Sequence, residues 1–289
     1  MGYKILVIIL FVSSLVSCQT NVSVKKDLMT GLITKGNGIS CENVNLSSSV
    51  DQLKRNSFTY GEKFYLNFDN TTGFKKQENK VFPGMELLIT NRKGDTIMHK
   101  PDMYKENSNG IDISPLLLQA NITAADPIHS GGNYTFFINI WDKKSAGTYS
   151  AEMDFNVQAN DKIAIDSNNI SFDEIYLFSS ENGNAIVDNN AKFDEKIYFI
   201  FEGLTGFYEE AGSFSIGLSM LAKDSEGNII VEEKDLLVDS KLDRSELKKL
   251  APNFIFSNSS IKSPISCEIQ IWDKKSDSKI HALTMLNIK

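Results

Sequence analysis

The stretch Ile140-Trp141-Asp142-Lys143-Lys144-Ser145 recurs unchanged as Ile271-Trp272-Asp273-Lys274-Lys275-Ser276, 131 residues further along the chain. Other pairs recur at this spacing or two residues beyond it: Ile39-Ser40 with Ile170-Ser171, Ser114 with Ser245, and Thr72-Gly73-Phe74 with Thr205-Gly206-Phe207. A spacing shared by separate motifs indicates an internal repeat. The 289-residue chain is therefore predicted to contain two copies of one unit, residues 28–158 and 159–289.

Each copy is predicted to be a series of short β-strands. Apolar and polar residues alternate along 64–68 and 197–201, and again along 134–140 and 265–271. This period of two indicates strands with one buried face. Glycine beside Asp or Asn in 92–95 and 225–228 is typical of hairpin turns. The last strand of each copy is predicted at 148–157 and 279–288.

A single short helical turn is predicted in each copy, beginning at Ser114 and at Ser245. Serine is a favoured N-cap, and Pro or Glu follows it here. About seven strands, a helical turn before the penultimate strand and a closing hairpin resemble an immunoglobulin-like (Ig-like) β-sandwich. The resemblance implies an all-β fold of two tandem sandwich domains, while other β-sandwich topologies stay open.

The first 17 residues are predicted to be a signal peptide. Lys4 precedes an apolar stretch, 5–16, which is too short to span a bilayer as a helix. The stretch ends in Leu15-Val16-Ser17-Cys18, which resembles the bacterial lipobox, and the chain resembles Bacteroidetes-type lipoproteins. The resemblance implies cleavage before Cys18 and attachment of lipid, including palmitate, to that residue. An ordinary signal peptide that contains a cysteine is the alternative.

Residues 18–27 are predicted to be a polar tether. In Bacteroidetes lipoproteins an acidic cluster just after the acylated cysteine is associated with export to the cell surface, and residues 19–23 contain no acidic residue. The resemblance therefore implies a protein anchored by lipid to the outer membrane, on its periplasmic side. The formal charge of −7 and the scattered lysine pairs argue against a nucleic-acid partner.

The two remaining cysteines are predicted to be free and buried. An exported chain suggests a disulfide, but the repeat places Cys41 opposite Phe172 and Cys267 opposite Phe136. Each cysteine thus occupies a position that the other copy fills with a large apolar ring. Small hydrophobic side chains in the cores of separate domains cannot approach closely enough to be bridged.

No motif of an enzyme or a metal site is present in the sequence. The three histidines, His99, His129 and His281, show no metal-ligand spacing, and there is no paired-cysteine motif, nucleophile elbow or phosphate-binding glycine loop. We therefore expect no catalytic residues, no cofactor and no metal. An unrecognised hydrolase is the alternative.

The candidate binding residues are Trp141, Asp142, Trp272 and Asp273 of the repeated motif. If Ile138 and Ile140 face inward, alternation directs Trp141 outward, where a large ring can serve as a binding platform. Alternatively, each tryptophan covers its own closing hairpin by packing on Tyr149 or Leu283. The two aspartates are expected to accept backbone N–H groups in the turns that follow them.

Two functions follow from these observations. The first is a non-catalytic, lipid-anchored envelope protein that binds or assembles with another protein in the cell envelope. The second is a carbohydrate-binding lipoprotein that resembles the tandem-domain glycan-capture proteins of Bacteroidetes, with Trp141 and Trp272 as its platforms.

Overall fold

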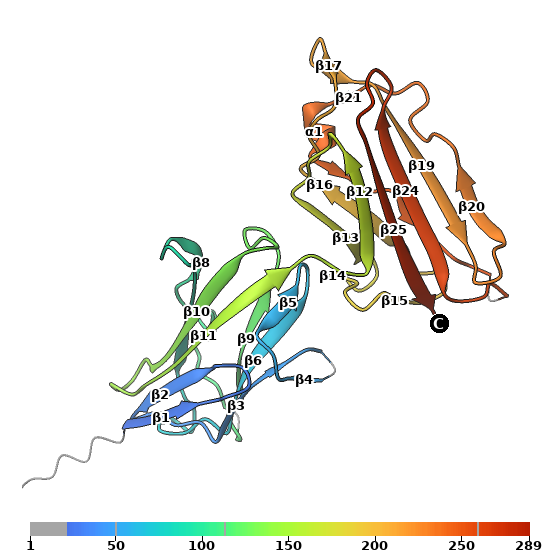
Figure 1. Ribbon diagram of the computed structural model, residues 1–289. Helices are drawn as coiled ribbons and strands as arrows, with labels where there is room; N and C mark the ends of the chain where they lie inside the picture. Colours follow the sequence, from blue (N-terminus) through green and yellow to red (C-terminus); the bar gives the residue numbers. More distant parts are fainter. Residues whose placement is uncertain (1–21, 50, 113, 259) are drawn as a thin grey trace, which may run out of the picture.

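The computed structural model describes residues 22–289 except 50, 113 and 259 (Figure 1). One large sheet of the first repeat has the order β1-β2-β11-β10-β7-β8, and β5 pairs with β11 in parallel. The opposing sheet has the order β4-β3-β6-β9. The bounds of the strands are β1 (Val22–Lys26), β2 (Ile33–Asn37), β3 (Asn43–Ser47), β4 (Gln52–Leu53), β5 (Ser57–Thr59), β6 (Lys63–Asp69), β7 (Pro83–Asn91), β8 (Thr96–Lys100), β9 (Leu118–Thr123), β10 (Asn133–Asp142) and β11 (Thr148–Gln158).

The second repeat has the same two layers. Its first sheet has the order β12-β25-β24-β19-β20, with β15 parallel to β25. Its second has the order β14-β13-β16-β22, and β23 also pairs with β16. A small third sheet, β17-β18-β21, is added at one end (Figure 1). The bounds are β12 (Ile163–Asn168), β13 (Glu174–Ser179), β14 (Asn184–Ala185), β15 (Asn190–Ala191), β16 (Ile197–Glu202), β17 (Glu209–Glu210), β18 (Ser213–Phe214), β19 (Ile216–Lys223), β20 (Ile229–Glu233), β21 (Leu242–Asp243), α1 (Arg244–Leu247), β22 (Lys249–Leu250), β23 (Asn253–Phe254), β24 (Ile265–Asp273) and β25 (Lys279–Ile288).

Each sandwich encloses its own apolar core. The buried cluster of the first repeat ends at Val157, and that of the second begins at Ile163. In β10 the residues Tyr134, Phe136, Ile138 and Ile140 are buried, as alternation predicts. The all-β class with two tandem Ig-like sandwiches is therefore confirmed. The predicted boundary at 158/159 falls between β11 and β12. That the two parts fold independently stays a prediction.

The prediction of a helical turn holds for the second repeat and is wrong for the first. In α1 the N-cap is Asp243, two residues before the predicted Ser245, and Glu246 completes a capping box with it. At the matching place in the first repeat, Ser114 and Pro115 form a bend. Pro115 stands where Glu246 stands in the second copy, so it offers neither an N–H nor a carboxylate to a capping box.

The predicted tether is shorter than expected. Residues 22–26 form β1, which pairs antiparallel with β2 along its whole length. All five residues are exposed. The strand is thus held by its backbone and has no buried face, since even Val22 and Val24 are exposed.

Both cysteines of the described part of the chain are free and buried, as predicted. Cys41 lies in the first core and Cys267 in the second. Burial raises the pKa of the Cys41 thiol to about 11 and that of Cys267 above its usual range.

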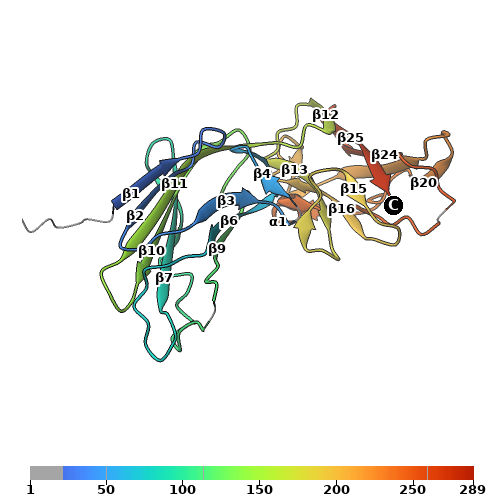
Figure 2. The same ribbon diagram turned by 90° about the horizontal axis from the view of Figure 1, so that it is seen from below.

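The two sandwiches meet at a junction formed by Tyr60 and Ser130 of the first repeat and Glu174, Tyr176 and Glu202 of the second. The rings of Tyr60 and Tyr176 are 5.2 Å apart between centroids, and both hydroxyls donate to Glu202, at 3.3 and 2.9 Å. Glu174 is only 3% exposed and accepts the Ser130 N–H at 2.7 Å. Figure 2 shows the repeats arranged end to end. No helix in the described part of the chain is long and apolar enough to cross a membrane.

Candidate functional site

The two motif tryptophans lie on glycines of the neighbouring strand. Trp141 pairs across the sheet with Gly84 and Trp272 with Gly217. A Cβ added at Gly84 would lie 2.2 Å from the Trp141 ring, and one at Gly217 would lie 2.1 Å from the Trp272 ring. Each ring therefore packs on a bare stretch of backbone and stays half-buried. The packing partner is the neighbouring strand, β7 or β19, whereas Tyr149 faces the core and meets Phe68.

Asp142 and Asp273, the other two candidate residues, are buried acceptors. Asp142 is 3% exposed and Asp273 is 4% exposed. Asp142 accepts the N–H of Lys144 at 2.9 Å and the hydroxyl of Ser145 at 2.6 Å, and Asp273 accepts the N–H of Lys275 at 2.8 Å. The expectation that each aspartate accepts a backbone N–H of the turn after it is confirmed.

The same carboxylates hold a second loop. Asp142 accepts the N–H of Lys75 at 2.7 Å, and Asp273 accepts the N–H of Tyr208. Lys75 and Tyr208 directly follow the repeated Thr-Gly-Phe motifs. Each aspartate thus joins the closing hairpin to the loop that follows β6 or β16. We call these loops, residues 70–76 and 203–209, the TGF loops.

A repeated ion pair completes this network. Lys143 lies 2.7 Å from Asp102, and Lys274 lies 2.8 Å from Asp235. Partial burial on its own raises the pKa of Asp102, but the hydrogen bonds from Lys143 and from the Tyr104 and Met85 amides outweigh it and hold the pKa below its usual range. The pKa of Asp235 is held below its usual range in the same way, with Lys274 as the cation.

Glycine is required at the centre of each TGF loop. Gly73 and Gly206 have φ angles of 94° and 101°, a region that side chains other than glycine rarely occupy. A Cβ on either would lie about 2 Å from a backbone carbonyl oxygen, that of Gly38 or Asn169. The loop is thereby fixed against the first sheet, with the phenylalanine that follows directed toward the sandwich.

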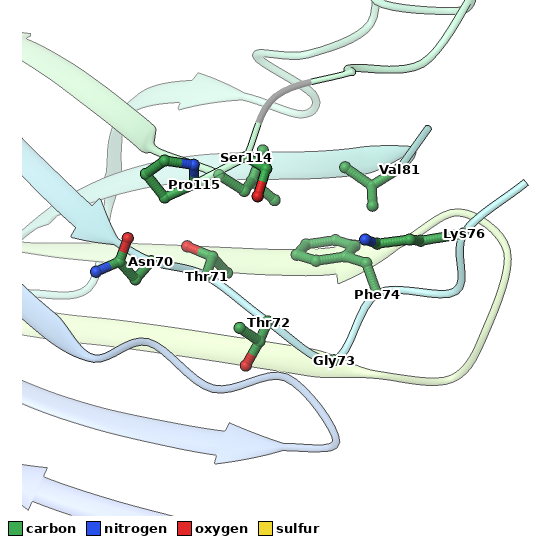
Figure 3. A pocket seen from close by; sticks show the side chains of 10 residues that line it. Asn70, Thr71, Thr72, Gly73, Phe74, Lys76, Val81, Ser114 and Pro115 are labelled. Carbon is green, nitrogen blue, oxygen red and sulfur yellow. The ribbon is translucent and has the colours of Figure 1, made fainter. Parts of the chain in front are cut away.

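A cavity of about 450 Å³ opens beside the TGF loop of the first repeat (Figure 3). Figure 3 shows the side chains of Phe74, Val81, Ser114 and Pro115 arranged around it. Lys76 is its charged lining residue, and Asn70, Thr71, Thr72 and Leu116 complete the wall. Its size lies within the range of small-molecule and peptide-anchor sites.

The second repeat has a cavity of about 370 Å³ at the equivalent place. Thr205, Gly206, Phe207 and Leu247 correspond to residues that line the first cavity. The remaining lining is different, because it includes the charged residues Asp173, Glu209, Arg244 and Lys248. Arg244 forms an ion pair with Glu209.

The four motif residues and the two cavities therefore have separate roles in the architecture. In each repeat the aspartate and tryptophan hold the end of the sandwich together, and the TGF loop that the aspartate fixes carries the cavity wall. The structure does not bring the two tryptophans together, since each belongs to its own repeat. The cavities were not predicted from the sequence, although the repetition of Thr-Gly-Phe was the signal that marks them.

The remaining titratable candidates lie apart from these cavities. His99 contacts Glu86 at 2.8 Å and His281 contacts Glu268 at 3.4 Å across neighbouring strands. His129 lies at the junction, 3.7 Å from Glu174. Within the described residues no group of three His, Cys, Asp or Glu side chains is placed to hold a metal. Cys18, the predicted lipidation site, lies outside the described residues.

No family model matches the chain, and no curated protein matches its sequence. Among solved structures, pT26-6p has 8% identity and a TM-score of 0.26, with 92% of this chain and 65% of that chain covered. The fibronectin(III)-like modules of Clostridium thermocellum CbhA have 12% identity and a TM-score of 0.21, covering 86% and 94%. A DUF3823 family protein from Bacteroides ovatus has 11% identity and a TM-score of 0.22, covering 72% and 90%. At TM-scores this low the likeness says nothing about function, and the fold class rests on the strand pairing described above.

Proposed function

We propose that this protein is a non-catalytic, lipid-anchored envelope protein that binds a protein partner through the cavities beside its TGF loops. Cys18 carries the lipid, and the outer membrane, on its periplasmic side, is the proposed location. The observation that carries the proposal is a cavity at the same place in both repeats. Both cavities are formed beside a TGF loop, and their other lining side chains differ. Two equivalent cavities with different linings are suited to binding two different parts of one partner.

The cavity chemistry favours a protein partner. Phe74, Val81, Pro115 and Leu116 offer an apolar surface in the first repeat, and Lys76 supplies a charge at its edge. The second cavity sets Phe207, Phe214 and Leu247 among charged residues of both signs. An apolar centre with a polar rim is the usual composition of a protein-binding hot spot.

Site-specific photo-crosslinking in intact cells tests this proposal. A photoreactive amino acid is placed at Lys76, in the first cavity, and at Lys248, in the second. The control position is Lys93, which is exposed in the turn between β7 and β8 and lines neither cavity. We expect both cavity positions to give the same discrete adduct and Lys93 to give none. Equal adducts from all three positions would contradict the proposal.

Carbohydrate binding at Trp141 and Trp272 is the second candidate function. It is favoured by the partial exposure of both rings, each supported from one side by a glycine. Aromatic rings held rigidly in this way can stack on a sugar. A glycan array is the test. If the natural chain binds a glycan that Trp141→Ala does not bind, while the TGF cavities are unaltered, carbohydrate binding becomes the preferred function.

The lipid anchor has its own test. Replacing Cys18 with Ser removes the thiol that the lipobox resemblance identifies as the acylated group. Metabolic labelling with a fatty-acid analogue should mark the natural chain and leave the Cys18→Ser chain unmarked. Labelling of both chains would show that the lipid is attached elsewhere.

A further inference from the structure

The two repeats differ at one edge of their larger sheets. In the first repeat β1 covers the outer edge of β2. The corresponding strand of the second repeat is β12, which pairs with β25 on its inner side. Among the residues that the structure describes, no strand pairs with the outer side of β12. Figure 1 shows β12 at the outer side of its sheet.

The pairing registers establish that these two edges are equivalent. Asn37 pairs with Thr148 and Ile33 with Glu152, while Asn168 pairs with Lys279 and Ala164 with Leu283. Each of these second-repeat residues lies 131 positions after its counterpart. The segment Ala164–Asn168 thus presents the backbone that, at residues 33–37 of the first repeat, binds an antiparallel strand.

The side chains along the two edges specify different neighbours. Lys35, on the outer face of β2, is replaced by Asp166 on β12, so the charge is reversed. On the inner face the buried Thr34 is replaced by Ile165, which packs partly against the second core. In the first repeat these positions pair with Val24 and Lys25 of β1. A strand suited to the second edge needs the opposite order, with a basic residue beside Asp166 and an apolar residue beside Ile165.

We propose that β12 is an acceptor for an extended segment of a partner protein, which adds to the sheet as an antiparallel strand across Ala164–Asn168. Main-chain hydrogen bonds hold such a strand, and alternate side chains select it. Its pattern is a basic residue opposite Asp166, directly followed by an apolar residue opposite Ile165. An open edge with free backbone groups is otherwise a site of uncontrolled association.

Two peptides of identical composition test this register. One repeats residues 21–27, Asn-Val-Ser-Val-Lys-Lys-Asp, and the other exchanges its fourth and fifth residues, which gives Asn-Val-Ser-Lys-Val-Lys-Asp. Binding of each labelled peptide to residues 19–289, the mature chain without its lipid-bearing Cys18, is measured by fluorescence anisotropy. Hydrogen exchange of the backbone amides locates the bound peptide.

We expect the exchanged peptide to bind about threefold to fivefold more tightly than the parent, as a cross-strand ion pair predicts, and to protect amides within 164–168. Asp166→Lys should abolish or reverse this preference. The matched control is Lys35→Asp at the same position of the first repeat, where β1 already occupies the edge, and it should leave the preference unchanged.

Three results of the peptide experiment would overturn the proposal. They are the absence of binding by either peptide, an equal effect of Asp166→Lys on both peptides, and protection confined to residues outside β12. Concentration-dependent dimerisation of the chain with protection of β12 would also overturn it, because the occupant would then be a second copy and not a partner.

Discussion

At the scale of the residue, the tryptophan–glycine pair explains why the repeated motif has been kept in both copies. The ring fits only where the neighbouring strand has no side chain, and that position is Gly84 in the first repeat and Gly217 in the second. Glycine in a strand interior costs stability on its own, so its presence at both places indicates a packing requirement. The pair is a fold feature whatever else the exposed part of the ring binds.

A double-mutant cycle measures this coupling. Trp141→Ala should destabilise the first repeat by about 2 kcal/mol, less than a fully buried ring, and Gly84→Ala should cost about 1–3 kcal/mol because the new methyl group displaces the ring. The double variant should be less destabilised than the sum of the two. Denaturant midpoints give the values, and Gly217 with Trp272 should behave alike. Strict additivity, or unchanged midpoints in both tryptophan variants, would contradict this packing role and favour the platform reading.

At the scale of the element, a buried aspartate joins two loops that are far apart in the sequence. Asp142 belongs to the end of β10, and its carboxylate accepts from Lys75 in the TGF loop as well as from its own turn. The cavity wall therefore depends on a residue that does not line the cavity. A loop held in this way is ordered before a partner arrives, which lowers the entropy cost of binding.

Removal of this carboxylate should loosen the end of the sandwich. Asp142→Ala leaves the partly buried N–H groups of Lys75 and Lys144 without their acceptor, so we expect a loss of about 1 kcal/mol for each, the low end for an unsatisfied group. Asp273→Ala should have a similar effect in the second repeat. Asp277 is exposed in the turn of the second motif, so Asp277→Ala is the control and should change stability by less than about 0.5 kcal/mol. Equal unfolding midpoints for Asp142→Ala and the natural chain would refute the role of this hydrogen-bond network.

Elements with a buried face could be predicted from the sequence, and elements held by backbone alone could not. The alternation in β6 and β10 predicted their positions and inward faces correctly, and the position of β11 was predicted as well. The exposed β1 buries no face and has only two apolar residues, Val22 and Val24, which is too little to distinguish it from a tether. The helical turn predicted at Ser114 failed because Pro115 removes the capping box. The TGF cavities were missed because each is formed by residues from three or four separate segments, which only the folded chain brings together.

At the scale of the whole molecule, the junction between the two repeats is rich in titratable groups. Burial raises the pKa of Glu174, opposed by the Ser130 hydrogen bonds and the nearby His129. Burial also raises the pKa of the Tyr60 and Tyr176 hydroxyls, and the charge of Glu202 adds to it. The contact between the repeats is therefore polar at its centre, in contrast to the two apolar cores.

The raised pKa of Glu174 predicts a pH dependence of stability. A carboxyl group whose pKa is higher in the folded than in the unfolded state stabilises the fold most below its unfolded pKa, about 4.3, and loses this contribution as pH rises through the folded pKa. Glu174→Gln, which cannot ionise, should lack this component. The free energy of unfolding measured from pH 4 to pH 7 should thus fall more steeply, or rise less, in the natural chain. Parallel curves for the two chains would contradict the prediction.

The two repeats should fold independently. Because each has a complete core, fragments 22–158 and 159–289 should each unfold cooperatively when isolated. The second fragment loses the contacts of Glu174, Tyr176 and Glu202 with its neighbour, and that of Ala185 with Gly61. Calorimetry and denaturant unfolding of both fragments and of the full chain provide the measurement. Unfolded fragments combined with a single transition in the full chain would mean that the repeats stabilise one another.

Because Cys41 lies in one core and Cys267 in the other, each cysteine can report the transient unfolding of its own repeat. A thiol-specific reagent reaches a buried sulfur only while the surrounding sandwich is transiently open, so the rate of labelling reports that opening. Peptide mass analysis assigns each modified cysteine to its repeat. Exposure during transport, mechanical load or partner release can then be followed separately in the two halves of one molecule, without a foreign probe.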